Sequence, residues 1–167
     1  MNEAQRLWST QAQADHDMFV QLRGRDAPEC HLLHYLQMAT EKLSKAYFWR
    51  SGHPPPRSHI GFVRFLKALL SRQAELERIA GTLGFGRPED LRDWVRTVQP
   101  LAYGLQNIAP DLAQNGPNPE YPWPHEGPTH CPAEYRFPLW RELRDTGKGR
   151  KLIDFVHRSI SRFDAFA

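Results

Sequence analysis

The chain has 167 residues, a formal net charge of +3 at pH 7 and a sequence pI near 9.0. Its length suits one domain with a real hydrophobic core, and no apolar run approaches the roughly 18 to 20 residues that cross a bilayer. The polar first residues predict no secretory signal, and Cys30 and Cys131 are too few for a disulfide framework, so we expect a cytoplasmic protein with reduced thiols and no membrane partner.

The first two predicted helices cover residues 3 to 24 and 30 to 52. Asp15 lies on the apolar stripe of the first helix, where a carboxylate needs a partner, so we expect it to pair with a Lys or Arg of the next helix. The second helix is the longest uninterrupted pattern in the chain, and we expect it to be the buried centre of the fold. Its apolar positions recur at spacings of three and four: Leu32, Leu36, Ala39, Leu43, Ala46 and Tyr47.

The middle of the chain predicts more helix. A stripe from Ile60 to Leu83 follows a plausible N-cap at Ser58, and a slip in its pattern near residues 71 to 74 leaves open whether it is one helix or two. A further helix starts at Arg87 with Pro and acids in its first turn, and Pro100 is expected to kink or split it because proline lacks the amide donor.

Residues 110 to 138 hold eight of the fourteen prolines, which argues against helix and central strand alike. Aromatic residues in this segment argue against disorder, so we expect an ordered extended arm lying across the helices. A short helix over residues 138 to 145, a hinge at Gly147 to Gly149 and a final helix from residue 150 follow. No confident strand is predicted. The fold class is therefore all-α, an up-and-down four-helix-type bundle with extra short helices and a long Pro-rich arm.

The charge is concentrated near the C-terminus. Between Arg136 and Arg162 there are eight Lys or Arg against three Asp or Glu, which is +5 and leaves about −2 for the remainder. Such a segment is typical of a nucleic-acid interface or of a solvated surface. The candidates for nucleic-acid binding are Lys148, Lys151, Arg158 and Arg162.

Several motifs resemble the HEPN superfamily, the higher eukaryote and prokaryote nucleotide-binding domains. The resemblance covers mainly residues 8 to 66, and a Tyr-Pro pair at residues 121 and 122 is similar to a family element in which an arginine stands where this chain has Glu120. The matching positions are Trp8, Ala12, Asp15, Cys30-His31, Gln37-Met38-Ala39-Thr40-Glu41-Lys42, Lys45-Ala46, Gly52 and Arg57-Ser58-His59.

The resemblance implies a single helical domain over residues 1 to 167, often homodimeric, that accompanies nucleotidyltransferases or acts in toxin–antitoxin and RNA-directed defence. Ribonucleases of the family use an Arg followed by four to six residues and a His. Arg150 with His157 fits this spacing, although Lys151 and Leu152 follow the arginine. We expect a non-catalytic module that binds RNA, a nucleotide or a partner protein; a metal-independent ribonuclease using Arg150 and His157 is the alternative.

Two further sets of residues suggest ligands. Polar groups along the second helix could line a groove for a nucleotide or anion, or could form a buried hydrogen-bond network between helices. Basic groups around the triple-proline turn could hold a phosphate or a carboxylate. The ligand-binding candidates are therefore His34, Gln37, Glu41, Lys45, Arg57 and His59.

A metal-binding helical bundle, resembling the DinB-like fold, is the other enzyme alternative. It would require three histidines on separate helices that face one cavity. Cys30 and His34 are four residues apart and could both reach one zinc, but His125, His130 and Cys131 lie in the Pro-rich arm without the close spacing of a zinc finger. We therefore expect no metal, and we expect no other cofactor. The potential ligands are Cys30, His31, His34, His125, His130 and Cys131.

Overall fold

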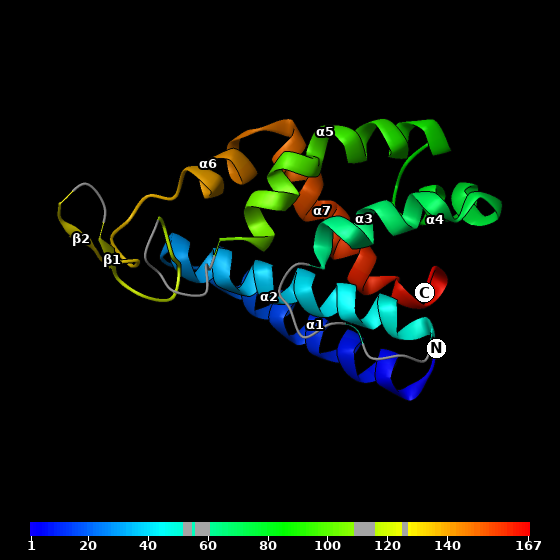
Figure 1. The fold of residues 1–167 in the computed structure, drawn as a ribbon, viewed down its shortest axis with the longest axis horizontal. Coiled ribbons are helices and arrows are strands. Elements are labelled where there is room, and N and C mark those ends of the chain that lie inside the picture. Colours follow the sequence, from blue (N-terminus) through cyan, green and yellow to red (C-terminus); the bar gives the residue numbers. More distant parts are fainter. Residues whose placement is uncertain (52–54, 56–60, 109–115, 125–126) are drawn as a thin grey trace.

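The computed structural model describes residues 1–51, 55, 61–108, 116–124 and 127–167. Its first two helices, α1 (Glu3–Arg23) and α2 (Glu29–Phe48), lie side by side and antiparallel (Figure 1). The Asn2 side chain caps α1 by accepting from the Gln5 amide, with the Gln5 side chain bonded back to the Asn2 amide. The expected partner of Asp15 is Lys42, whose Nζ lies 3.1 Å from Oδ2, so that prediction is confirmed.

The pattern slip near residue 72 corresponds to a break between two helices. A 3₁₀ turn, η1 (Trp49–Ser51), follows α2, and α3 (Phe62–Ser71) is separated from α4 (Leu76–Thr82) by η2 (Gln73–Glu75). Helix α5 (Pro88–Gln106) runs on through Pro100, so a split at this proline is excluded. Buried Leu101, Ala102 and Leu105 hold the second half of α5 against the core, which offsets the missing hydrogen bond.

The described part of the Pro-rich arm contains a feature that the sequence did not predict. Two very short strands, β1 (Trp123–Pro124) and β2 (Thr129–His130), pair antiparallel, with Trp123 opposite His130. The arm lies at one end of the molecule, beyond the first turns of α2, while both chain termini lie at the other end (Figure 1). The arm's aromatic residues pack on one another, and Trp123 is fully buried.

The last elements are α6 (Pro138–Asp145), α7 (Gly147–Ser161) and η3 (Phe163–Ala165). The predicted hinge at residues 147 to 149 is wrong, because these residues form the first turn of α7. Thr146 caps that turn, its Oγ1 accepting from the Gly149 amide at 3.0 Å. Gly149 allows close packing: a Cβ there would lie 2.3 Å from the Glu142 carbonyl oxygen of α6.

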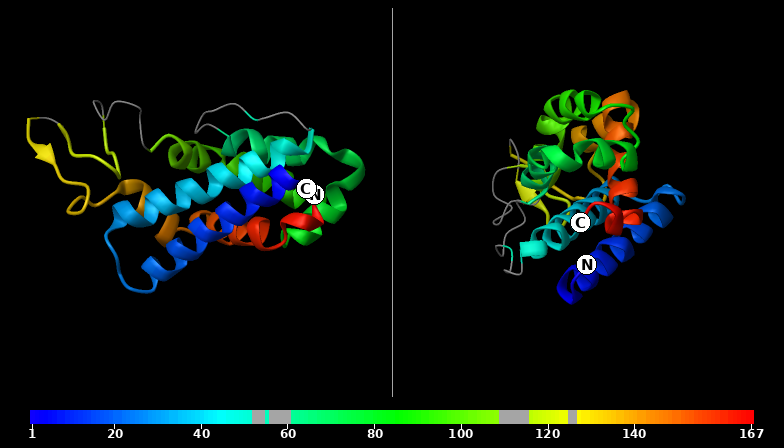
Figure 2. Two further views of the ribbon diagram at one scale, coloured as in Figure 1. Left: turned by 90° about the horizontal axis from the view of Figure 1, so that it is seen from below. Right: turned by 90° about the vertical axis from the view of Figure 1, so that its right-hand side faces the viewer.

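The all-α bundle predicted from the sequence is confirmed (Figure 2). Helix α2 packs against α1, α3, α5 and α7. Its predicted apolar stripe, from Leu32 to Tyr47, is at most 4% exposed. No helix in the described part of the chain has the length and apolar character that a bilayer crossing requires.

Candidate functional site

The uncharged polar groups of α2 form a buried network. Gln37 Nε2 donates to the Gln106 carbonyl oxygen of α5 at 3.2 Å, and Gln106 Oε1 accepts from the Val63 amide of α3 at 3.1 Å. Thr40 and Ser44 donate to carbonyl oxygens of their own helix. These bonds connect α2, α3 and α5, which corresponds to the predicted alternative of a buried hydrogen-bond network between helices.

The charged and histidine side chains along α2 also contact other residues of the same chain. Lys45 forms an ion pair with Glu41, and its Nζ lies 5.0 Å from the centre of the Trp8 ring. His34 Nδ1 lies 3.0 Å from a carboxylate oxygen of Glu120, which joins α2 to the arm. The structure therefore places His34, Gln37, Glu41 and Lys45 along one helix, each in contact with the protein itself; Arg57 and His59 lie outside the described residues.

The four nucleic-acid-binding candidates lie along one face of α7. Two of them cluster near its start: the Lys148 Nζ lies 2.6 Å from a carboxylate oxygen of Glu142, and Lys151 lies over the Phe85 ring, 4.2 Å from its centre. Both side chains remain exposed. The side chains of Lys148 and Lys151 are therefore held by contacts with Glu142 and Phe85 and remain accessible to solvent.

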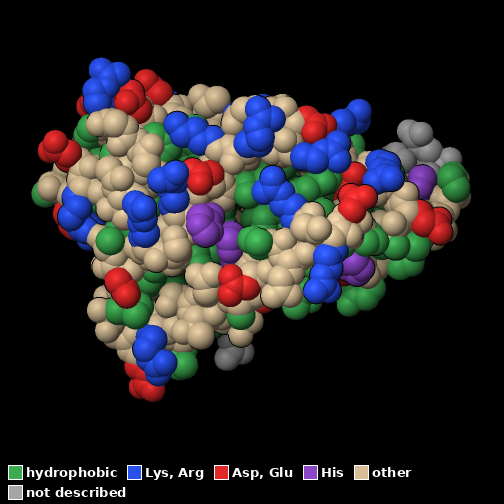
Figure 3. Space-filling view, turned by 180° about the vertical axis from the view of Figure 1, so that it is seen from behind, with side chains coloured by type: hydrophobic (Ala, Val, Ile, Leu, Met, Phe, Trp, Pro, Cys, Tyr) green, Lys and Arg blue, Asp and Glu red, His purple; other side chains and the backbone are tan. Residues whose placement is uncertain are grey.

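The other half of the α7 face contacts the end of α4. Arg158 Nε donates to Asp154 at 2.8 Å, and Arg162 Nη1 donates to the Thr82 carbonyl oxygen at 3.1 Å. Arg158 also lies against Gly84, whose φ of +84° suits glycine; a Cβ there would lie 2.9 Å from Nη1. Seen from behind, this face of the molecule shows basic and acidic side chains interspersed, without one continuous basic surface (Figure 3).

Arg150 and His157 occupy different environments on α7. Arg150 Nη1 donates to the Asp145 carbonyl oxygen at 2.9 Å, so its guanidinium is bound to the end of α6. His157 is exposed and its ring centre lies 5.2 Å from that of buried His16. Burial lowers the pKa of His16, as does His157, against an opposing effect of Asp17. The two candidate catalytic residues are about 10 Å apart along the helix axis.

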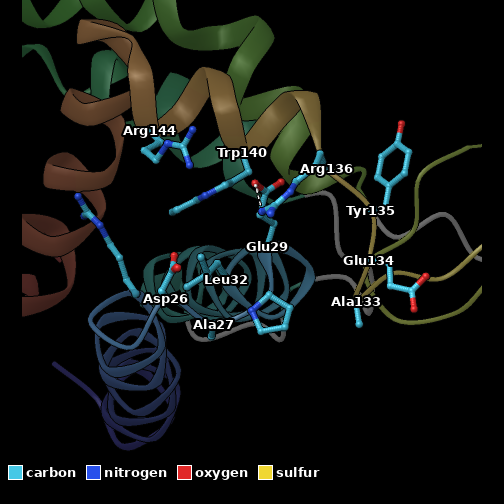
Figure 4. A pocket seen from close by; sticks show the side chains of 12 residues that line it. Asp26, Ala27, Glu29, Leu32, Ala133, Glu134, Tyr135, Arg136, Trp140 and Arg144 are labelled. Atoms are coloured by element: carbon cyan, nitrogen blue, oxygen red, sulfur yellow. Dashed lines mark hydrogen bonds and ion pairs between the residues drawn. The ribbon is translucent and has the colours of Figure 1, made fainter.

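The sequence did not predict a cavity between the α1–α2 turn, the end of the arm and α6 (Figure 4). Its volume is about 450 Å³, and an adjoining cavity of about 420 Å³ shares Glu29, Arg136 and Arg144 with it. In Figure 4, Trp140 extends from α6 toward α2, with Arg144 and Leu32 on either side. The larger cavity is lined by as many arginines as carboxylates, whereas the adjoining one has Arg136, Arg141 and Arg144 against Glu29 alone; Arg23 lines the larger cavity.

One carboxylate organises this cavity. Glu29, in the first turn of α2, accepts from the Phe137 amide at 2.7 Å and lies 3.4 Å from Arg136 Nη1. It therefore ties the end of the arm to the start of α2. The Glu29 side chain is 10% exposed, whereas that of Arg136 is 88% exposed, so the guanidinium remains in water.

The remaining arginines differ in their partners. The Arg144 guanidinium donates two hydrogen bonds to the Asp145 carboxylate, at 2.7 and 3.1 Å, and these bonds lower the pKa of that carboxyl. Within the described residues, neither Arg23 nor Arg141 has a hydrogen-bond or ion-pair partner. The basic excess after Arg136 was a signal of this cavity, but the contribution of the α1–α2 turn was not visible, because it lies more than a hundred positions away in the sequence.

The described residues offer no group of three His, Cys, Asp or Glu side chains that could hold a metal ion. Cys30 is buried and Cys131 exposed, both as free thiols, and burial raises the pKa of Cys30. His125, one of the potential ligands, lies outside the described residues.

A scan against protein-family models, a search of curated proteins and a search of solved structures each find no match to this chain.

Proposed function

We propose that this protein is a non-catalytic, HEPN-like helical module that binds RNA through the basic face of α7. The observation that carries the proposal is the alignment of four basic side chains on that face. Their spacings of three, seven and four residues keep them on one side of a helix. The side chains are Lys148, Lys151, Arg158 and Arg162.

The contacts of this face suit a phosphate backbone. Lys151 lies over a ring and Arg162 donates to a carbonyl oxygen, so neither forms an ion pair with a carboxylate of the described residues. Lys148 and Arg158 have carboxylate partners that are 42% and 51% exposed, where ion pairs are weak and exchange readily. Phosphates could replace these partners, and the resulting affinity would fall steeply with salt.

The engagement of Arg150 favours binding without catalysis. Its guanidinium donates to the carbonyl oxygens of Asp145 and Arg144, at 2.9 and 3.4 Å, and so helps to close the end of α6. A group that must stabilise phosphate charge during cleavage would have to leave these contacts. We therefore expect labelled RNA to remain intact on incubation, with or without the His157→Ala substitution. Metal-independent cleavage that His157→Ala abolishes would establish the ribonuclease alternative instead.

The experiment is fluorescence anisotropy of a labelled single-stranded RNA at 50 and 200 mM salt. The charge reversal Arg158→Glu with Arg162→Glu should weaken binding at least about tenfold and flatten its salt dependence, because two phosphate contacts become repulsive. The matched control, Arg92→Glu with Arg96→Glu, makes the same charge change on α5 and should reduce affinity much less. Equal losses in the two variants would show that only overall charge matters and would refute a specific α7 face.

The proposal includes a homodimer and, as further ligands of the same module, a nucleotide or a partner protein such as a nucleotidyltransferase. Exposed apolar residues on α1, Leu7 at 55% and Met18 at 37%, support an interface on its outer face. Light scattering coupled to gel filtration tests the dimer. Leu7→Lys with Met18→Lys should convert a dimer of about 39 kDa, twice the 19.4 kDa of the chain, to a monomer.

A further inference from the structure

Arg136, Arg141 and Arg144, at the start of α6 and along it, form a second basic cluster that uses none of the four basic residues of the α7 face. The cavity beside Arg136, Arg141 and Arg144 is lined by one acidic residue, Glu29. Both oxygens of that carboxylate already face donors, the Phe137 amide and Arg136. Among the described residues that line this part of the cavity, an incoming anion would therefore meet three guanidinium groups and a carboxylate that already has donors.

We propose that this double cavity binds a phosphate monoester, with the phosphate on Arg136, Arg141 and Arg144. A guanidinium presents paired donors that match two phosphate oxygens, and a dianion can accept from several such groups at once. Arg141 has no hydrogen bond or ion pair within the described residues, and the 88% exposed Arg136 side chain is held only by its 3.4 Å contact with Glu29, so both guanidinium groups have donors left for a ligand.

The neighbouring half of the cavity defines the rest of the ligand. Asp26 and Glu134 line only that half, so they would repel a second anionic group there. Leu32, Pro28 and Trp140 give the same half an apolar wall. The ligand is accordingly a monoester whose organic part is uncharged and partly apolar, rather than a diphosphate or a dicarboxylate.

Isothermal titration calorimetry of the whole chain at pH 7.5 tests this inference, with phenyl phosphate as the probe and phenol as the neutral control. Arg141→Gln removes a guanidinium that forms no hydrogen bond or ion pair within the described residues, and Arg141→Gln with Arg144→Gln removes two guanidinium groups. The matched control is Arg96→Gln, an exposed arginine of α5 whose side chain is 76% exposed. Far-ultraviolet circular dichroism of each variant checks that the helices are retained.

Saturable binding of phenyl phosphate, about tenfold weaker in Arg141→Gln, weaker again in the double variant and unchanged in Arg96→Gln, supports the site. Binding of phenol alone, no saturation at millimolar phenyl phosphate, or equal affinity in Arg141→Gln overturns it. If Arg144→Gln disturbs the fold, the single Arg141→Gln variant decides the question by itself.

Two further arms separate the source of the phosphate and the two proposals. A nucleoside 5′-monophosphate has an uncharged organic part, so tighter binding of it than of phenyl phosphate assigns the site to nucleotides, and the reverse order assigns it to another small metabolite; both outcomes support monoester binding. The Arg158→Glu, Arg162→Glu variant should bind phenyl phosphate as the wild type does. The experiments can therefore refute phosphate binding in the cavity while supporting RNA binding by the α7 face, and the reverse.

Discussion

The polar side chains of α2 and the arginines beside α6 are both gathered around a helix, but they differ in their hydrogen-bond and ion-pair partners. Gln37 donates across to α5, and Lys42 and Lys45 each form an ion pair with a carboxylate of the same chain. Beside α6, Arg141 has no hydrogen bond or ion pair within the described residues, Arg136 reaches Glu29 only at 3.4 Å, and Arg144 pairs with the exposed Asp145. The first region holds helices together, and the second keeps positive charge available.

The difference follows from burial. A polar group inside the bundle must find a protein partner, because an unpaired one costs about 1 to 3 kcal/mol. A guanidinium at the rim stays hydrated and loses little by remaining unpaired. Unpaired charge is therefore a better indication of a ligand site here than polarity along a helix. Four predictions, each with a control, test how buried and exposed positions of this fold differ.

The largest expected effect is at the junction of α6 and α7. Gly149→Ala should destabilise the protein by about 3 kcal/mol, because the new Cβ would lie 2.3 Å from the Glu142 carbonyl oxygen and 2.5 Å from the Leu143 Cα. Denaturation in urea measures the loss. The control is Gly147→Ala, in the same helical turn with no atom within 4 Å of its Cβ, which should change stability by less than about 1 kcal/mol. Similar losses in both would contradict the close packing.

The next effect concerns the carboxylate that anchors the arm. Glu29→Ala should cost about 2 kcal/mol, because the buried Phe137 amide, now 2.7 Å from Glu29, loses its acceptor. Glu29→Gln keeps an acceptor oxygen and should cost less in the same urea titration. Glu134→Ala, an exposed carboxylate of the same cavity, is the control and should have almost no effect. An Ala variant as stable as the Gln variant would remove the anchoring role.

A smaller effect is expected for the ion pair between α1 and α2. A double-mutant cycle on Asp15→Ala and Lys42→Ala should give a coupling energy of about 1 kcal/mol, since both side chains are less than a fifth exposed. The comparison pair, Asp93 and Arg96, lies at 2.9 Å but is more than 70% exposed on both sides, so its coupling should be close to zero. Equal coupling in the two cycles would mean that burial does not strengthen the inner pair.

The smallest effect is a pH dependence at His16. Because the folded protein lowers its pKa, the unfolded chain binds the proton more readily, and stability is lost as pH falls below the ordinary value near 6.5. His16→Gln should therefore lose less stability than the wild type between pH 7.5 and 5.5. His31→Gln, at an exposed position of α2, is the control and should keep the wild-type slope. An unchanged slope in His16→Gln would exclude this contribution.

Much of the bundle could be predicted from apolar spacing. The stripe from Leu32 to Tyr47 identified the central helix, and the unusual carboxylate at Asp15 predicted a partner that is Lys42. Both inferences depend on local periodicity, which a single sequence states directly. The continuation of α5 through Pro100 was harder to predict, because the packing of α5 onto the core outweighs a single lost hydrogen bond.

The cavity beside α6 could not be predicted in the same way. Its lining combines the α1–α2 turn, residues near Arg136 and helix α6, and no periodic pattern relates these segments. Gly149 was similarly misread as a hinge, since a glycine that permits close packing and one that permits bending look identical in sequence. The predicted roles of Arg57 and His59 lie outside the described residues and stay predictions.

The burial of Trp123 has a practical consequence. Its indole is fully buried, with ring centres 4.9 Å from Tyr135 and 5.6 Å from His130. Indole and phenol transitions at this separation couple in a fixed chiral arrangement, so the arm should carry its own near-ultraviolet dichroism band. The difference between wild-type and Trp123→Phe spectra would isolate that band and provide an intrinsic optical marker for the arm.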